Sequence, residues 1–380
     1  MNSVIENKNK KALIDNSKLM VEAFARAGAD VFIGYPITPA NLLYLYSSRR
    51  FPMFFAAPDE ITTLQWMSGF AATGKLPVTA TSFPGYALMI ESINMAAMME
   101  LPMVIVLVQR LGPATGTATC GAQGDISVVN GTMSGGFPIP TISISNAKDC
   151  WDIAAKSVEI ALELRTPVVL LTSKEEVMTQ ISIDLSQFAE IKAVERKYYT
   201  GPEPFIPYKA KENLVPEFLP VTNNKHQVRI TASTHDKFGI IQNVEQEAID
   251  NSKRLNDKIF KNIDKFLFYN LDEDKSAKTL IVSYGITSRA ACEAVNTLRK
   301  DGKKVSSLVI KTLFPVHPIY FEICDKYEKI IFAEENLNGQ YRQIMFGTRS
   351  NPKVHGVNSF GKMINPHDII NKVEEVERNK

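Results

Sequence analysis

Short apolar runs alternate with longer helical patterns along the first half of the chain. Such an alternation of strand and helix is typical of a parallel sheet covered by helices on both faces. The chain is therefore predicted to be an α/β protein. Strands are predicted at residues 31–34, 53–56, 77–81, 103–108, 141–145 and 167–172, and helices at 17–27, 40–48, 60–73, 85–99 and 149–164.

The alternation of strand and helix stops after residue 197 and resumes at about residue 277. Residues 198–276 are rich in Pro, Lys and Asn and contain one amphipathic helical pattern, so they are predicted to be a connector. A second, shorter strand–helix alternation follows. The predicted organisation is an α/β domain over 12–197, a connector over 198–276 and a smaller α/β domain over 277–380.

Bulk composition is that of an ordinary globular protein, with 380 residues, 45% hydrophobic residues and 22% charged residues. A net charge of +2 gives no reason to expect a nucleic-acid partner. The start of the chain, Met1–Lys11, has no apolar segment of the signal-peptide type, and no stretch is long enough to cross a bilayer. A cytoplasmic protein without membrane contact is expected.

The four cysteines lie far apart in the chain, with no Cys-x-x-Cys pair. This spacing excludes an iron–sulfur binding run or a zinc ribbon within the chain and disfavours structural disulfides. Phosphate-binding glycine motifs, a zinc-protease motif and a serine nucleophile elbow are also absent. The cysteines are Cys120, Cys150, Cys292 and Cys324.

Three different polar groups follow predicted strands, at Gly34–Pro39, Pro58–Glu60 and Val108–Gly116. They are the hydroxyl of Thr38, the carboxylate of Glu60 and the guanidinium of Arg110. Because the carboxyl ends of neighbouring parallel strands meet at one edge of a sheet, these groups are expected to form a site there.

Each of the three residues also has a purely structural interpretation. Glu60 could be an acid that favours a helix N-terminus, and Thr38 could be a turn hydroxyl that caps the helix after it. Arg110 could be a surface cation. The residues after Glu60 are mostly small and apolar, so its carboxylate is expected to point into an interface, which weakens the structural interpretation without excluding it.

Several motifs together resemble the α subunit of the 2-oxoacid:ferredoxin oxidoreductases, which are thiamine-diphosphate enzymes acting on pyruvate, 2-oxoglutarate or branched 2-oxoacids. The resemblance covers residues 17–375 in the order typical of that family. It implies a pyrimidine-type thiamine-diphosphate-binding domain followed by a transketolase C-terminal-like domain. The motifs are Tyr35-Pro-Ile-Thr-Pro39, Asp59-Glu60-Ile61, Thr81-Ser-Phe-Pro-Gly85, Val108-Gln-Arg110, Gly112-Pro-Ala-Thr-Gly116, Gln123-Gly-Asp125, Lys311-Thr-Leu-Phe-Pro315 and Glu335-Asn-Leu-Asn-Gly-Gln340.

The resemblance implies roles for particular residues. Glu60 matches the glutamate that bonds N1′ of the aminopyrimidine and favours the tautomer that removes the C2 proton. Thr38 matches a threonine that contacts the 2-oxoacid, and Arg110 falls where an arginine pairs with the substrate carboxylate. Further cofactor contacts are implied for Pro36, Ile37, Ser82, Phe83 and Pro84.

The chain lacks the Gly-Asp-Gly segment with which thiamine enzymes hold pyrophosphate and Mg²⁺. By this resemblance, the chain supplies the pyrimidine side of a thiamine-diphosphate site. A β subunit supplies the pyrophosphate and Mg²⁺ side and a [4Fe-4S] cluster, and γ and δ subunits are further candidate partners. Coenzyme A and ferredoxin are the implied acyl and electron acceptors.

The sequence departs from the family at two places that bear on function. Phe83 stands where a small residue is usual, and Cys120 stands where many members carry a Lys or Arg. Two rival functions remain open: a catalytically silent assembly subunit, and a thiamine-dependent decarboxylase or lyase component that does not use ferredoxin.

Overall fold

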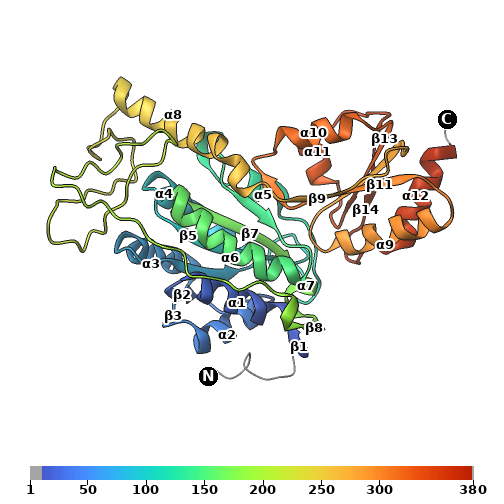
Figure 1. Ribbon diagram of the computed structural model, residues 1–380, viewed down its shortest axis with the longest axis horizontal. Coiled ribbons are helices and arrows are strands. Elements are labelled where there is room, and N and C mark those ends of the chain that lie inside the picture. The colour runs from blue at the N-terminus through green and yellow to red at the C-terminus, as the bar shows by residue number, and fades with distance from the viewer. Residues whose placement is uncertain (1–10, 379–380) are drawn as a thin grey trace.

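A seven-stranded sheet forms the first half of the molecule in the computed structural model, which describes residues 11–378 (Figure 1). Six of its strands are parallel, and β12 joins one edge antiparallel. The order is β12-β6-β7-β5-β4-β2-β3. The strands are β2 (Val31–Gly34), β3 (Met53–Ala56), β4 (Pro77–Thr81), β5 (Met103–Gln109), β6 (Thr141–Ser143), β7 (Pro167–Ser173) and β12 (Thr312–Phe314).

Helices cover both faces of this sheet. On one side α1 (Asn16–Ala27) packs against α2 (Asn41–Arg50) and α6 (Ala147–Leu164), and on the other α3 (Glu60–Ala72) packs against α4 (Phe83–Met98). Successive residues of β5 face opposite cores: Met103, Ile105 and Leu107 belong to one hydrophobic cluster, and Val104, Val106 and Val108 to the other. This two-sided burial explains why the predicted strands read as continuous apolar runs.

The second half of the chain forms a five-stranded sheet in the order β14-β13-β10-β11-β9, with β9 antiparallel at its edge. The strands are β9 (Tyr269–Asp272), β10 (Thr279–Ser283), β11 (Val305–Ile310), β13 (Lys329–Glu334) and β14 (Val354–Asn358). The helices are α9 (Thr287–Lys300), α10 (Pro318–Asp325), α11 (Gln340–Phe346) and α12 (Pro366–Arg378).

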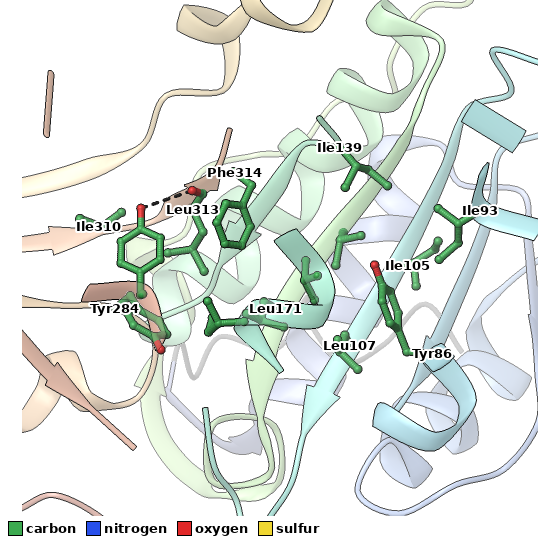
Figure 2. Close-up of a cluster of buried hydrophobic side chains, with 14 of the residues drawn as sticks. Tyr86, Ile93, Ile105, Leu107, Ile139, Leu171, Tyr284, Ile310, Leu313 and Phe314 are labelled. Carbon is green, nitrogen blue, oxygen red and sulfur yellow. Dashed lines mark hydrogen bonds between the residues drawn. The ribbon is translucent and has the colours of Figure 1, made fainter. Parts of the chain in front are cut away.

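One hydrophobic cluster runs without interruption from α4 to the second sheet (Figure 2). Tyr86 and Leu107 lie at one end of it, and Tyr284 and Phe314 lie at the other. Because Phe314 belongs to β12, the second half of the chain contributes both a strand and core side chains to the first half. The two halves are therefore held in a fixed relation by shared burial.

The segment between the sheets consists mostly of loops that extend away from the second sheet and return through α8 (Gln246–Lys261) (Figure 1). Buried Glu100 holds this helix, since its carboxylate pairs with Arg254 and accepts a bond of 2.7 Å from Lys258 Nζ. The boundaries at residues 198 and 277 stay predictions.

The predicted α/β fold with a parallel sheet covered on both faces is confirmed, with corrections in detail. The helix expected at 85–99 begins two residues earlier, at Phe83, because Pro84 suits the first turn of a helix. The strand expected at 141–145 ends at Ser143. Elements with weak hydrophobic patterns were missed: β1 (Lys11–Asp15), its antiparallel partner β8 (Gln180–Asp184), α5 (Ile126–Asn130), α7 (Lys174–Met178), β9, β12, β14 and α11.

All four cysteines are unpaired, as expected. Within residues 11–378, no helix is both long and apolar enough to cross a membrane. The polar segment at the start of the chain lies outside the described residues, apart from Lys11.

Candidate active site

The direction in which strands are added to the first sheet reverses between β2 and β4. The chain passes from β2 to β3 on one side, then crosses to β4 on the other side and continues outward to β5. The pairing of β2 with β4 covers only Val31 with Pro77 and Phe32 with Val78, although β4 continues to Thr81. The strands therefore part at their carboxyl ends, where ligands of open α/β sheets bind.

The predicted site residues all follow strands that flank this opening. Thr38 lies beyond β2, Glu60 beyond β3, Ser82 beyond β4 and Arg110 beyond β5. All four strands are parallel, so these residues share one edge of the sheet.

Glu60 is the first residue of α3, and its side chain is not needed to cap the helix. Asp59 is the N-cap and accepts a hydrogen bond of 2.7 Å from the backbone N–H of Thr62. Glu60 is only 6% exposed. Burial raises the pKa of its carboxyl group, and the charge of Asp59 adds to the rise, while the backbone N–H of Glu60 opposes it. A buried carboxyl group with a raised pKa is suited to hold or release a proton.

Gly85 makes room for the Glu60 side chain. A Cβ at this residue would lie 2.5 Å from Glu60 Oε1 and 2.6 Å from Glu60 Cγ, closer than real contacts allow. Only glycine lets the first turn of α4 approach the carboxylate in this way. The sequence motif Thr81-Ser-Phe-Pro-Gly85 thus places Glu60 against the end of β4.

Ser82, Phe83 and Pro84 form the start of α4. Ser82 is the N-cap residue, but its hydroxyl makes no capping bond. Its Oγ is buried and has no hydrogen-bond partner, which is rare for a buried hydroxyl. Phe83 and Pro84 are half-buried beside it. An unpartnered buried hydroxyl at this edge fits a contact with a bound molecule.

Arg110 reaches across from the end of β5 to the segment after β2. Its Nη1 donates a hydrogen bond of 2.5 Å to the backbone carbonyl of Thr38. The residue is 6% exposed, and its Nε is buried without a partner. Burial lowers the pKa of the guanidinium, and the charge of Asp125 opposes that shift. Arg110 is therefore a buried cation and not the surface cation of its structural interpretation.

Thr38 does not cap the helix that follows it, because the N-cap residue of α2 is Ala40 and makes no side-chain cap bond. Thr38 and Ile37 are half-buried, and Pro36 is exposed. The described contacts link Arg110 with Thr38, and place Glu60 and Thr81 both beside Gly85; none joins these two groups directly.

Asp125 was not among the predicted site residues, although the motif that contains it was noted. Its carboxyl group is buried, its Oδ2 has no partner, and burial raises its pKa to about 7, opposed by Arg110. The sequence signal was the single acid in Gln123-Gly-Asp125, which does not reveal that the loop folds back against Arg110.

Across residues 11–378, no three His, Cys, Asp or Glu side chains gather in a way that could hold a metal ion.

This chain is similar to a known family and to individual proteins within it. First, residues 22–254 match the family model described as pyruvate flavodoxin/ferredoxin oxidoreductase, thiamine-diphosphate-binding. The chain belongs to this family, as its motifs predicted.

Second, the similarity to individual proteins extends over nearly the whole chain. It is 30% identical to the 2-oxoglutarate synthase subunit KorA of Methanothermobacter thermautotrophicus, over 93% of this chain and 95% of that one. It is 31% identical to the ketoisovalerate oxidoreductase subunit VorB of the same organism, over 92% of this chain and 93% of that one.

Solved structures extend the likeness to the fold. The 2-oxoglutarate:ferredoxin oxidoreductase of Magnetococcus marinus superposes with a TM-score of 0.89 at 25% identity. The match covers 97% of this chain but 65% of that one, so this chain spans about two thirds of its length. A split-gene transketolase, at a TM-score of 0.54 and 14% identity, shares the fold alone.

Proposed function

We propose that this chain is the α subunit of a heteromeric, thiamine-diphosphate-dependent 2-oxoacid:ferredoxin oxidoreductase. The complex converts a 2-oxoacid and coenzyme A to an acyl-CoA and CO₂ and passes two electrons to ferredoxin. The observation that carries the proposal is the buried carboxyl group of Glu60, beside the opening between β2 and β4, in a chain of this family.

The residues around Glu60 suit the aminopyrimidine half of thiamine diphosphate. Glu60 would hold the hydrogen bond to the ring nitrogen N1′, and its raised pKa lets the proton in that bond move. The unpartnered hydroxyl of Ser82 and the side chains of Pro36, Ile37, Phe83 and Pro84 would line the ring. When bound, the cofactor would supply a deprotonated carbon as the nucleophile for the oxo carbon and an acceptor for the electron pair left when CO₂ departs.

Arg110 would bind the carboxylate of the 2-oxoacid, with Thr38 beside it. The bond from Nη1 to the Thr38 carbonyl fixes the plane of the guanidinium, and Nε remains without a partner. A planar, pre-oriented guanidinium recognises a carboxylate better than a flexible ammonium does. The acids to test first are 2-oxoglutarate and 2-ketoisovalerate, which the names of the relatives contain.

We infer that a partner subunit completes the site by holding the pyrophosphate and Mg²⁺, and that it carries the [4Fe-4S] cluster. Two observations support a partner at this face. The relatives are named as subunits. In addition, α3 and α4 carry one charged residue each, Glu60 and Glu91, while Ile61, Trp66 and Leu88 are 41–51% exposed on them. Exposed apolar residues grouped on neighbouring helices are typical of an interaction surface.

The two rival functions are less well supported. A silent assembly subunit would have no need for a buried Glu60 against Gly85 or a pre-oriented Arg110. A thiamine-dependent decarboxylase that does not use ferredoxin would have the same residues, but the relatives are named as synthases or oxidoreductases.

Calorimetry tests the shared cofactor site. Thiamine diphosphate with Mg²⁺ should bind the reconstituted complex tightly and the isolated chain weakly or not at all, because this chain supplies only the pyrimidine side. The isolated chain's circular dichroism spectrum should show that it is folded. Tight, Mg²⁺-dependent binding to the isolated chain would contradict the shared site.

A further inference from the structure

Asp125 and Arg110 are buried groups of opposite charge that interact electrostatically without a direct bond. Among the described residues, neither takes part in an ion pair within 4.0 Å, and Asp125 Oδ2 and Arg110 Nε are both buried without a hydrogen-bond partner. Unpartnered buried polar atoms are rare and costly, and two of opposite charge in one site call for a ligand between or beside them.

Hydrogen bonds from two elements hold the backbone around Asp125 in place, and a third element brings Tyr86 close enough for an electrostatic interaction. From β5, Gln109 Oε1 accepts a bond of 3.3 Å from the backbone N–H of Asp125. From α11, Gln340 Nε2 donates to the carbonyl of Gly124 at 2.8 Å. From α4, Tyr86 lies within the electrostatic reach of Asp125, and its hydroxyl bonds to Thr132 at 2.8 Å. Arg110 and Tyr86 are thus two titratable side chains that interact with Asp125, and Arg110 supplies the opposite charge.

A structural explanation of Asp125 is weak. The residue precedes α5 at the N-cap, but its side chain makes no cap hydrogen bond. Its backbone N–H, and not its carboxylate, makes the bond to Gln109. The carboxyl group therefore does little to hold the loop.

We propose that Asp125 is a positioning residue that balances the charge of Arg110 between turnovers and takes up a proton when a 2-oxoacid carboxylate binds Arg110. This inference rests on the proposed function. One guanidinium compensates one carboxylate, and a second ionised carboxylate in the same buried place would be left without compensation. A 2-oxoacid is a stronger acid than an aspartic side chain, so the proton goes to Asp125.

The cycle is balanced in protons and charge. The proton comes from solvent on binding and returns to it when the substrate carboxylate leaves as neutral CO₂. The charge of Arg110 is then balanced again by ionised Asp125, through their electrostatic interaction and not through a direct bond. The pKa of Asp125, raised by burial to about 7 against the opposing charge of Arg110, lets this proton exchange occur near neutral pH.

The test compares the wild-type complex with an Asp125→Asn complex, using whichever of 2-oxoglutarate and 2-ketoisovalerate the wild type oxidises. The acid binds the form in which Asp125 is protonated. Wild-type kcat/KM should therefore fall about tenfold per pH unit above about pH 7. In Asp125→Asn the group is neutral at every pH, so the profile should be flat over this range. With an aldehyde that lacks the carboxylate, both complexes should show the same profile.

A binding measurement gives a second readout. Calorimetry of the acid on thiamine-free complex, in two buffers of different ionisation enthalpy, should show uptake of about one proton above pH 7 in the wild type. Asp125→Asn should show none. The matched control is Glu176→Gln, which removes another buried carboxyl whose pKa is raised to about 7 by burial and which pairs with Arg289 at 2.7 Å. This control should keep the wild-type profile and proton uptake.

Two outcomes would overturn the inference. One is an Asp125→Asn complex with the wild-type pH profile and proton uptake. The other is an equal loss on acid and aldehyde with a lower melting temperature, which would make Asp125 a structural residue. Failure of the proposed function looks different: a wild-type complex with bound cofactor that oxidises no 2-oxoacid at any pH.

Discussion

The carboxyl edges of the two sheets both carry buried acids, but the acids are in opposite situations. At the end of β13, Glu334 accepts hydrogen bonds from the backbone N–H groups of Tyr341 at 2.8 Å and Arg342 at 2.9 Å. It also accepts from Asn336 Nδ2 at 3.0 Å and from the Tyr284 hydroxyl at 3.1 Å. All four bonds end on this one carboxylate, and the two from backbone N–H groups hold the start of α11 to the second sheet.

At the edge of the first sheet, several buried polar atoms have no hydrogen-bond partner. Ser82 Oγ, Arg110 Nε and Asp125 Oδ2 are buried without partners, and no side chain bonds the carboxyl group of Glu60 within the described residues. The second edge has an exception in Arg342 Nε, which is also unpartnered. Four hydrogen bonds to one carboxylate indicate structure, whereas several unpartnered groups at a strand opening indicate a binding site.

Of the substitutions at the two edges, Glu60→Gln should have the largest effect on turnover. The amide can still meet the cofactor's N1′, but it cannot carry the proton that the carboxyl group exchanges. Turnover of the complex should fall about 10²–10⁴-fold, as for the loss of a general acid–base group. Glu60 makes no cap bond, so the melting temperature should change little. Steady-state kinetics measures the rate, and a thermal melt measures the stability. A large fall in melting temperature together with the fall in rate would mean that Glu60 has a structural role.

Replacing Arg110 by Lys should have the next largest effect. A point charge cannot reproduce a planar two-pronged contact, and the loss of a charge-assisted bond costs about 1.5–3 kcal/mol. The kcat/KM for the 2-oxoacid should fall about 10–150-fold. An aldehyde without the carboxylate should be processed about equally by both forms. Equal losses on both substrates would mean that Arg110 serves only to hold the segment around Thr38.

Replacing Glu334 by Gln should affect stability and leave chemistry intact. An amide nitrogen would face a backbone N–H that now donates to the carboxylate, so one donor loses its acceptor. The expected cost is about 1–3 kcal/mol in the free energy of unfolding, measured from the denaturant midpoint. The rate per folded complex should not change. A large fall in that rate with unchanged stability would mean that Glu334 serves the reaction and not the fold.

The first sheet was predictable from sequence because its strands are buried on both faces and read as apolar runs. β2 (Val31–Gly34), β3 (Met53–Ala56) and β4 (Pro77–Thr81) have the predicted limits. β12 was not predictable, since a short strand that joins a sheet far away in the chain has no local signal.

The candidate site was predictable in part. Position after a strand pointed to Glu60, Thr38 and Arg110, and the edge they share follows from parallel pairing. The sequence could not show that Gly85 gives the Glu60 carboxylate its space, or that the loop bearing Asp125 returns to Arg110. Both depend on packing between segments distant in the chain.

Exchange of the cofactor's C2 proton in the assembled complex reports the step assigned to Glu60 before any substrate binds. Nuclear magnetic resonance after rapid transfer to deuterated water would compare wild type with Glu60→Gln, both saturated with thiamine diphosphate and Mg²⁺. We expect exchange to be slowed about 10²–10⁴-fold in the variant, and to keep the wild-type rate in Glu334→Gln. Exchange at the wild-type rate in Glu60→Gln would contradict this expectation, and Glu60 would then be only an acid at the start of a helix.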